Sequence, residues 1–519
     1  MEMENRFLIW LLFVTGAAAL YVAYEVLNWV WFKPKKIEKQ LQEQGLKGNP
    51  YRLLYGDLKE MQKTLKKACS QPVKGFSHAF EPRVIPLYQD VVHKYGKNGY
   101  AWFGPEASVI VMDPESIKEV TLKYDVFNKP HSNPLSKLLL RGVVSYEGDK
   151  WVKHRKIINP AFHQDKLKHM LPSFHTSAME TVSIWDAMVA EKGSTEVDVL
   201  PYLQTLTSDA ISRTAFGSNY EEGKRIFELQ REQAELVVIA LRSLYIPGWR
   251  FLPTKMNRRM KSISKVVNNS IGIIVSERIK AMEAGVACED DLLGTLLESN
   301  FKEMDEHGKK EVGLSIQDVI EECKLFYFAG QETTSTLLVW TMVLLSKYSH
   351  WQTLAREEVL QHFGTKKPDY DGLHHLKTVS MILYEVLRLY PPVPVIARRS
   401  TQEIKLGKMT LPAGGLLSLP IMLLHRDTEL WGEDALEFKP ERFADGVSHA
   451  TKGQVIFFPF GWGPRICIAQ NFALLEAKMA MALILQRFSF ELSPSYTHAP
   501  ISIITLRPQY GAHLILHKI

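Results

Sequence analysis

The chain has 519 residues, 46% of them hydrophobic and 23% charged, which is enough apolar material for a large core and excludes a disordered chain. The net charge of +6 is small for this length and no basic face with interleaved aromatic residues stands out, so we expect no nucleic-acid partner. The four cysteines include no CxxC pair, which excludes a zinc clip and a disulfide framework and favours a reducing compartment.

The amino-terminal segment predicts a membrane anchor. Residues 7–24 are uncharged and mostly apolar, and the apolar character resumes after Glu25 as far as Phe32. A helix needs about 20 such residues to cross a lipid bilayer. Lysines follow the run between residues 33 and 39, and the positive-inside rule therefore places the rest of the chain in the cytosol. We predict a single-pass transmembrane helix at residues 1–32, anchored in the endoplasmic reticulum membrane.

The alternative interpretation of this segment is a cleaved signal peptide, because Ala17–Ala19 are small residues of the kind found at cleavage sites. The flank before the apolar run is not basic, and the run is long for a signal peptide, so an uncleaved anchor is favoured. Residues 33–50, which contain two prolines, are predicted to be a polar linker. Residues 51–519 then form the body of the protein.

The body is predicted to be mainly α-helical with a small β region. Residues 98–112 indicate two short strands around a Gly-Pro turn, and residues 404–420 indicate another small sheet. Residues 488–493 and 503–517 are also predicted to be extended. The strands therefore come from both ends of the body, and the segments between them favour helices.

The longest predicted helix runs from Ser315 to about Tyr348, a length of roughly 50 Å. Ser315 is a candidate N-cap and Asp318 lies three residues later, the spacing of a capping box. The middle of this helix contains Gly330, although glycine costs about 1 kcal/mol relative to alanine inside a helix. A glycine here has two explanations, a functional site or close packing against another helix.

A loop near the carboxyl end carries the strongest chemical signal. Residues 460–469 read FGWGPRICIA, and glycine and proline preclude a regular helix there. The apolar run at residues 472–485 predicts a helix that follows the loop. A helix amino terminus stabilises a thiolate, and Arg465 is placed to meet an anionic group near Cys467.

This loop resembles the cysteine-ligand loop of the cytochromes P-450, F-x-x-G-x-R-x-C-x-G, a family that holds haem iron through a thiolate. The resemblance implies the cytochrome P-450 fold, haem b as cofactor, and Cys467 as the axial ligand of its iron. Phe460 belongs to the same cofactor-binding loop. The sequence departs from the pattern at Ala469, where the family has glycine, and this leaves the electronic properties of the iron open.

Further motifs follow in the order that the family requires. Residues 329–334 (AGQETT) resemble the oxygen-binding stretch of its central helix. The resemblance implies that Ala329 and Gly330 leave room for dioxygen, and that Thr333 and Glu332 are catalytic residues that relay protons.

The E-x-x-R pair and a downstream arginine complete the pattern. Glutamate and arginine three residues apart share one helix face. The resemblance implies that a buried network supports the haem pocket and consists of Glu385, Arg388 and Arg442.

Several arginines are candidates to bind the haem propionates. Trp151 and Arg155 match the W-x-x-x-R pattern that serves this purpose in the family, and Arg465 adds a third member. The family often places another partner after the Tyr-Pro-Pro break at residue 390, where Arg398 and Arg399 are adjacent. We favour Arg398, and the sequence alone leaves the choice open.

The resemblance extends to a subfamily, the plant seventy-two clan, through residues 48–52, 321–334 and 488–494. Its members include secologanin-forming enzymes, oleanane triterpenoid oxidases and gibberellin hydroxylases. We therefore predict an NADPH- and O2-dependent monooxygenase that oxidises a lipophilic plant terpenoid. Substrate contacts are predicted at apolar positions that core packing would explain equally well: Phe328, Val395, Ile396 and Ile503.

The chain contains no G-x-G-x-x-G nucleotide loop, so NADPH is expected to act through a separate flavoprotein, an NADPH–cytochrome P-450 reductase. A cytochrome b-type electron donor is a further candidate partner, beside the lipid bilayer. Two other functions stay open: a haem-thiolate isomerase or lyase that needs no reductase, and a non-catalytic haem-binding protein. Thr333 argues against the isomerase or lyase, which needs no proton relay, and the intact oxygen-binding motif argues against the non-catalytic protein.

Overall fold

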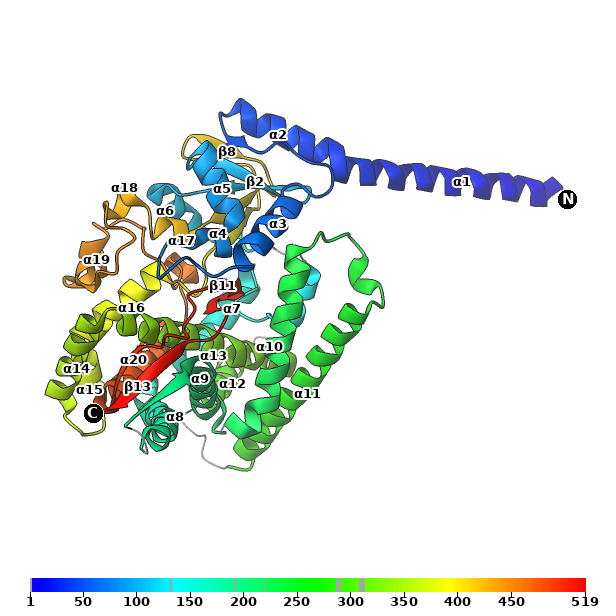
Figure 1. The fold of residues 1–519 in the computed structure, drawn as a ribbon. Helices are drawn as coiled ribbons and strands as arrows, with labels where there is room; N and C mark the ends of the chain where they lie inside the picture. Colours follow the sequence, from blue (N-terminus) through cyan, green and yellow to red (C-terminus); the bar gives the residue numbers. More distant parts are fainter. Residues whose placement is uncertain (1, 131–132, 191–192, 219, 286–290, 308–312) are drawn as a thin grey trace.

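The computed structural model describes residues 2–130, 133–190, 193–218, 220–285, 291–307 and 313–519. It shows a largely helical body from which the first helix projects as a long rod (Figure 1). Strands β2 (Gly99–Phe103) and β8 (Met409–Leu411) lie near that rod, whereas β13 (His513–Lys518) lies on the other side of the body, near the C-terminus (Figure 1). The predicted fold, mainly α with a small β region behind one amino-terminal helix, is confirmed.

The projecting rod is one continuous apolar helix. α1 (Glu2–Leu27) contains no buried residue and passes through a π-helical turn (Asn28–Phe32) into α2 (Lys33–Glu43). The whole segment is long and apolar enough to cross a membrane, with a mean hydropathy of 2.0 in its most apolar window. This agrees with the predicted anchor.

The segment predicted as a linker is ordered onto the body. Most of it is helix α2, because Pro34 lies at a helix start, where proline is tolerated. The Glu38 carboxylate accepts a hydrogen bond of 2.6 Å from the backbone N–H of Tyr51, and the Tyr51 hydroxyl donates one of 2.6 Å to the Val30 carbonyl. Strand β1 (Lys47–Gly48) then joins the main sheet. The body of the protein therefore begins at α2, ahead of residue 51.

The main sheet has the strand order β1-β2-β3-β9-β6-β4. Strands from the amino-terminal quarter of the chain pair with strands near residue 400: β3 is parallel to β9, and β9 is antiparallel to β6. The bounds of its members beyond β1 are β2 (Gly99–Phe103), β3 (Glu106–Ile110), β4 (Phe127–Asn128), β6 (Ile396–Ser400) and β9 (Leu416–Leu419).

Three smaller sheets complete the β region. Their orders are β10-β13-β5, β11-β12 and β7-β8, and all of their pairs are antiparallel. The predicted strands at residues 404–420, 488–493 and 503–517 are confirmed, whereas β5 and β6 were not anticipated. The bounds are β5 (Ser194–Asp198), β7 (Ile404–Leu406), β8 (Met409–Leu411), β10 (Phe488–Leu492), β11 (Pro500–Ile503), β12 (Thr505–Pro508) and β13 (His513–Lys518).

The helices make up most of the body. Those of the first half are α3 (Leu58–Cys69), α4 (Glu81–Val84), α5 (Pro86–Tyr95), α6 (Pro114–Leu122), α7 (Gly148–Ile158), α8 (Gln164–Val189), α9 (Val199–Phe216), α10 (Tyr220–Arg242), α11 (Lys255–Glu283) and α12 (Leu292–His307). Those of the second half are α13 (Ile316–Lys347), α14 (Ser349–Phe363), α15 (Tyr370–His375), α16 (Lys377–Leu389), α17 (Ile421–Leu424), α18 (Thr428–Trp431), α19 (Gly446–Ala450) and α20 (Gln470–Arg487).

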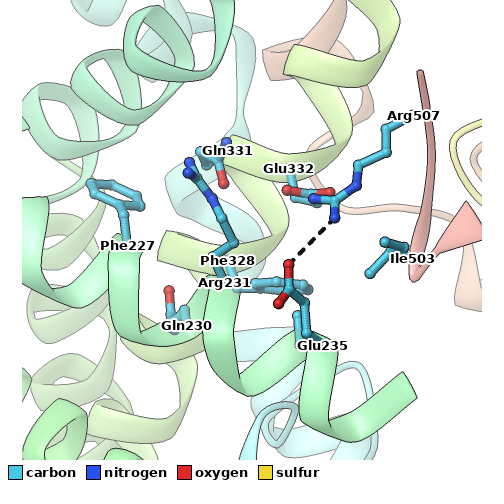
Figure 2. A pocket seen from close by; sticks show the side chains of 10 residues that line it. Phe227, Gln230, Arg231, Glu235, Phe328, Gln331, Glu332, Ile503 and Arg507 are labelled. Atoms are coloured by element: carbon cyan, nitrogen blue, oxygen red, sulfur yellow. Dashed lines mark hydrogen bonds and ion pairs between the residues drawn. The ribbon is translucent and has the colours of Figure 1, made fainter. Parts of the chain in front are cut away.

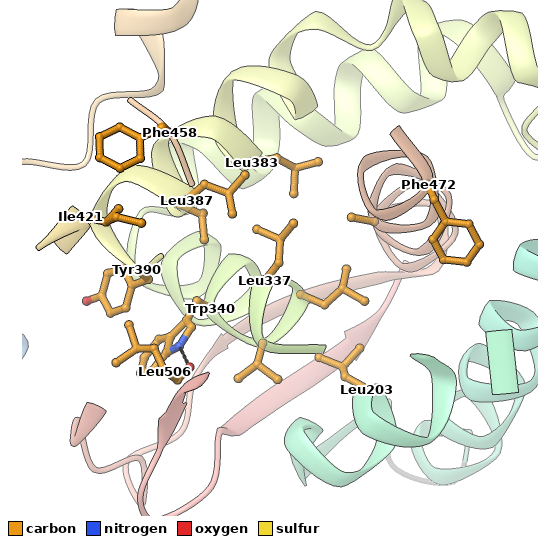
Figure 3. Close-up of a cluster of buried hydrophobic side chains, with 14 of the residues drawn as sticks. Leu203, Leu337, Trp340, Leu383, Leu387, Tyr390, Ile421, Phe458, Phe472 and Leu506 are labelled. Carbon is orange, nitrogen blue, oxygen red and sulfur yellow. Dashed lines mark hydrogen bonds between the residues drawn. The ribbon is translucent and has the colours of Figure 1, made fainter. Parts of the chain in front are cut away.

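Helix α13 is the central element of the core. It is buried along nearly its whole length, and α9, α16 and α20 pack around it (Figure 3). Trp340 of α13 also donates a hydrogen bond of 2.8 Å from its indole N–H to the Leu506 carbonyl. The helix thereby fixes the relative positions of the elements that carry the chemistry described below.

The predicted capping box at the start of α13 is present. The Ser315 hydroxyl accepts from the Asp318 N–H at 3.1 Å, and the Asp318 carboxylate accepts from the Ser315 N–H at 3.3 Å. These bonds satisfy two donors that a helix start otherwise leaves unpaired.

Replacing Ser315 with alanine removes the cap, and we expect the free energy of unfolding to fall by about 1 kcal/mol. Equilibrium urea unfolding followed by circular dichroism measures this change. Ser448→Ala, at an exposed serine of α19, is the matched control and should leave the midpoint unchanged. Equal midpoints for the Ser315 variant and the parent would contradict a stabilising cap.

Candidate active site

A cavity of about 390 Å³ lies between α13, α7, strand β6 and the loop before α20. Its volume falls in the range of small-molecule sites, and its wall is mostly apolar. Among the residues predicted from sequence, the wall includes Trp151, Arg155, Ala329, Gly330, Thr333, Ile396, Arg398, Phe460, Arg465 and Cys467. The fold therefore brings most of the predicted site together around one space.

The loop before α20 presents Cys467 to this cavity. The Cys467 N–H donates a hydrogen bond of 2.8 Å to the Phe460 carbonyl, which closes the loop on itself. Gly463 has a φ of +71°, and a Cβ atom there would lie 2.8 Å from the Thr121 carbonyl oxygen. Only glycine suits such a backbone, so the glycines of the motif shape the turn that holds the cysteine.

Cys467 lines the cavity, and its surface is exposed to that space. Burial raises its pKa, while the backbone N–H of Ala469 and the positive charge of Arg155 lower it. A buried thiol of this kind is deprotonated outright when it coordinates a metal ion. Ala469, the departure from the family pattern, lies immediately before α20 and also lines the cavity.

Positive charge gathers at one side of the cavity. Its wall includes the cations Lys129, Arg155, Arg398 and Arg465. Within the described residues, Glu147 is the carboxylate that pairs with this group, through an ion pair with Arg465. Positive charge is therefore in excess around a largely apolar space.

Electrostatic repulsion and burial both act on these cations. Burial and the charges of Arg398 and Arg465 lower the pKa of Lys129 to about 7. Burial and the charge of Arg465 lower the pKa of Arg398 to about 10. A bound anionic group would relieve both effects, because a nearby negative charge favours the protonated forms.

The arginines are held in place by different partners. Arg155 donates a hydrogen bond of 2.9 Å to the Ile466 carbonyl of the cysteine loop. Arg465 lies 4.0 Å above the Trp151 ring, a cation–π contact, and donates to the Tyr146 carbonyl at 2.8 Å. The helix that carries Trp151 and Arg155 is thus joined to the cysteine loop.

Arg398 and Arg399 have different surroundings. Arg398 lines the cavity, whereas Arg399 forms an ion pair of 2.8 Å with Glu106 and a hydrogen bond of 2.8 Å to the Gly414 carbonyl. Alternation along strand β6 places the two side chains on opposite faces of the sheet. This arrangement favours Arg398 as the residue that meets an anion in the cavity.

Helix α13 presents Thr333 and Gly330 to the cavity. The Thr333 hydroxyl donates a hydrogen bond of 2.7 Å to the Ala329 carbonyl one turn earlier. A Cβ atom at Gly330 would lie 2.9 Å from the Cδ1 atom of Ile211 on α9. The close approach of α9 supports the packing explanation of this glycine, and the functional explanation stays a prediction for a residue that borders the cavity.

Glu332 lies on another face of the same helix. Its carboxylate accepts a hydrogen bond of 2.5 Å from the Thr505 hydroxyl and borders a separate small pocket with Arg231 and Arg507 (Figure 2). Burial raises its pKa, and the Thr505 hydrogen bond and the two arginines lower it. The structure thus does not place Glu332 beside Thr333 in the main cavity.

Two predicted substrate contacts also lie elsewhere. Phe328 and Ile503 border the same separate pocket as Glu332 (Figure 2). Val395 is half-buried against the core, while its neighbour Ile396 lines the main cavity. The helix period explains the placement of Phe328, since adjacent residues point about 100° apart around the axis.

The E-x-x-R pair forms a fully buried ion pair away from the cavity. Both Glu385 oxygens accept from the Arg388 guanidinium, at 2.7 and 2.8 Å, and Arg388 also donates to backbone carbonyls of residues 425, 435 and 437. Arg442 approaches Glu385 at 3.6 Å and pairs with Asp434 at 2.7 Å. The predicted three-residue network is present and ties α16 to the long segment that leads to the cysteine loop.

Lys129 is a site residue that sequence reasoning missed. No local pattern marks it, since it follows a two-residue strand in an irregular stretch. The pairing of β4 with β6 brings it close to Arg398, and its ammonium group donates a hydrogen bond of 2.5 Å to the Val144 carbonyl. Only the sheet topology could have revealed this contact.

Comparisons with known proteins agree with this geometry. The family model described as cytochrome P450 matches residues 72–514. Cytochrome P450 CYP72A219 of Panax ginseng is 60% identical over 508 residues, which are 98% of each chain. The 7-deoxyloganic acid hydroxylase of Catharanthus roseus is 56% identical over 524 residues, which cover 100% of each chain.

The fold has a counterpart among solved structures. The retinoic acid-bound cyanobacterial CYP120A1 matches with a TM-score of 0.72 at 23% sequence identity. The match covers 83% of this chain and 94% of that chain, so the likeness extends over nearly the whole body.

Replacing Glu385 with glutamine should lower the free energy of unfolding by about 3–5 kcal/mol, because the Arg388 charge would stay buried without its counterion. Thermal unfolding monitored by circular dichroism measures the effect. Glu429→Gln, at a largely exposed partner of Lys97, is the control and should change stability by less than about 0.5 kcal/mol. A similar small change in the Glu385 variant would show that the pair is dispensable.

Proposed function

The chain belongs to the cytochrome P450 family, and we propose that it is an NADPH- and O2-dependent monooxygenase of lipophilic plant terpenoids. Membership of the family implies a monooxygenase with haem b as cofactor and electrons supplied by a redox partner. The observation that carries the proposal is the arrangement of the main cavity, where the Cys467 thiol, Thr333 and a group of excess cations all line one apolar space.

The residues of the cavity fit haem b. Cys467 supplies a thiol that faces the space, and the apolar wall suits a porphyrin. The excess of positive charge matches two propionates, which Trp151, Arg155, Arg398, Arg465 and Lys129 would hold. Bound there, haem supplies dioxygen activation, and its thiolate ligand favours O–O cleavage.

The chain itself contributes orientation, exclusion of water and a proton. Apolar side chains around Thr333 keep bulk water from the reacting centre, and Ala329 and Gly330 border the space where dioxygen would bind. The Thr333 hydroxyl faces the cavity and is the group placed to hand over a proton. Glu332 would resupply that proton from the polar pocket behind α13, after its carboxyl turns away from Thr505.

The proposed substrate class rests on the name of one relative and on the apolar wall of the main cavity. One relative is named as a hydroxylase of 7-deoxyloganic acid, and the wall offers an apolar surface that suits a terpenoid skeleton. Ile396 of strand β6 and the valines of residues 143–144 contribute to this apolar wall. An isomerase or lyase, or a haem protein without turnover, would have no use for a threonine hydroxyl at this point.

The partners and the location follow from the family and from α1. The exposed apolar helix Glu2–Leu27 would anchor the chain in the endoplasmic reticulum membrane with the body in the cytosol. Electrons would come from an NADPH–cytochrome P450 reductase, with a cytochrome b-type protein as a further donor. The lipid bilayer would also concentrate a lipophilic substrate near the protein.

Product formation in microsomes that contain this protein and a plant reductase tests the proposal. The panel consists of an iridoid, an oleanane triterpenoid, a gibberellin and a steroidal sapogenin, each with and without NADPH. We expect an oxygenated product from at least one of them, only with NADPH. Product without NADPH would favour the isomerase or lyase, and no product from any terpenoid would refute the proposed substrate class.

Replacing Cys467 with serine should abolish the thiolate-type carbon monoxide difference spectrum and the product, because a serine oxygen donates less electron density to iron. Reduced-minus-oxidised spectra in the presence of carbon monoxide provide the measurement. Cys69→Ser, at a half-buried cysteine far from Cys467 in the sequence, is the control and should keep the parent spectrum. A parent-like spectrum for the Cys467 variant would overturn the ligand assignment.

A further inference from the structure

Helix α13 carries buried glutamates besides Glu332 that the proposed mechanism does not use, and Glu322 is the most deeply buried of them. Glu322 lies in the first half of the helix and is completely buried. A buried carboxylate is costly unless hydrogen bonds compensate it. The hydrogen bonds of the Glu322 carboxylate therefore show which part of the structure it holds in place.

One carboxylate oxygen holds the segment at residues 142–147. The backbone N–H of Val143 donates a hydrogen bond of 3.1 Å to Oε2 of Glu322. A Cβ atom at Gly142 would lie 2.5 Å from the same oxygen, and Gly142 has a φ of +86°. Both the space and the backbone conformation thus demand glycine where the chain meets the carboxylate.

The other oxygen is held by a histidine of α7. Nδ1 of His154 lies 2.6 Å from Oε1 of Glu322, the geometry of an imidazole N–H that donates to a carboxylate. The His154 ring is buried and packs edge-on against Tyr146, with ring centroids 4.6 Å apart. Burial raises the pKa of Glu322, and the hydrogen bonds from His154 and from the Val143 N–H lower it.

The held segment forms part of the active-site wall. Val143 and Val144 line the main cavity, and the Val144 carbonyl accepts the hydrogen bond from Lys129. Further along, the Tyr146 carbonyl and the Glu147 carboxylate bind Arg465. The segment therefore links the substrate side of the cavity to its cations.

We propose that Glu322, held by His154, is a positioning residue that fixes residues 142–144 against α13 and thereby sets the shape of the substrate cavity. The pair transmits the position of the central helix to a wall that has no regular secondary structure of its own. Substrates that reach this wall depend on the pair, whereas ligands too small to reach it do not. The inference rests on the proposed function only in taking this cavity as the substrate site.

Hydrogen exchange tests the first half of the proposal in the intact protein. Glu322→Gln keeps the size of the side chain and removes its charge, so we expect amide exchange at residues 140–147 to accelerate by about tenfold, the effect of losing one hydrogen bond to a charged group. Mass spectrometry of peptides resolves the change. A uniform rise over all peptides, or no rise at residues 140–147, would overturn the proposal.

The matched control is Glu81→Gln. Glu81 is also a shielded glutamate in an ion pair, at 2.6 Å from Arg426, and it does not line the main cavity. Glu81→Gln makes the same chemical change as Glu322→Gln, also at a buried side chain. Exchange at residues 140–147 should stay at the parent level in this variant, and a rise as large as that of Glu322→Gln would assign the effect to general loss of stability.

Ligand size tests the second half. Imidazole and 4-phenylimidazole both bind the iron of the purified holoenzyme through nitrogen, and visible spectra report their dissociation constants. In Glu322→Gln we expect the dissociation constant of 4-phenylimidazole to change by about tenfold and that of imidazole to stay constant. Equal responses of the two azoles would refute a role in shaping the wall.

A second pair of variants covers the case in which Glu322→Gln does not fold. In His154→Asn the side-chain amide N–H takes the place of Nδ1–H. This variant should retain both the slow exchange and the parent azole affinities. His154→Leu lacks the donor and should lose both. Equal behaviour of the two variants would contradict the proposal. Because no readout requires turnover, failure of the inference is distinguishable from failure of the proposed function, which the product assay decides.

Discussion

The angular position of each residue around one buried helix determines which environment its side chain meets. Helix α13 passes through the core with nearly every face covered, so each side chain meets a different environment according to its angle around the axis. Thr333 meets the apolar cavity and the adjacent Glu332 meets a polar pocket, although the two are sequence neighbours. The helix thus separates the mostly apolar main cavity from a smaller pocket that contains charged side chains.

The elements that flank the cavity are connected to one another and to α13. The loop that carries Cys467 meets the cavity from the opposite side, and Arg155 of α7 holds it through the Ile466 carbonyl. Helix α7 is in turn joined to α13 through His154 and Glu322. Cys467, Arg155 and Thr333 therefore belong to elements that are joined to one another, and buried charged groups, which are costly in general, form some of the connections.

Features fixed by local chemistry could be predicted from the sequence. The capping box at Ser315, the Gly-Pro turn between β2 and β3 and the shaped loop around Cys467 each depend on a few neighbouring residues. Features fixed by tertiary contact could not. Lys129 reaches the cavity only because β4 pairs with β6, and Phe328 leaves it because it lies about 100° from Ala329 around the helix. The segment after the anchor was predicted as a linker because its polar composition does not reveal its contact with Tyr51.

That contact has a consequence for how the protein can be recombined. The Tyr51 hydroxyl bonds to the Val30 carbonyl, and the Tyr51 N–H bonds to Glu38, so the end of the rod is joined to the start of the body. The tilt of the first helix in a bilayer would consequently influence the orientation of the body relative to the membrane. In a chimaera with a foreign leader sequence, the natural junction lies before Asn28, within the exposed stretch, and a junction near residue 50 would cut through the coupling.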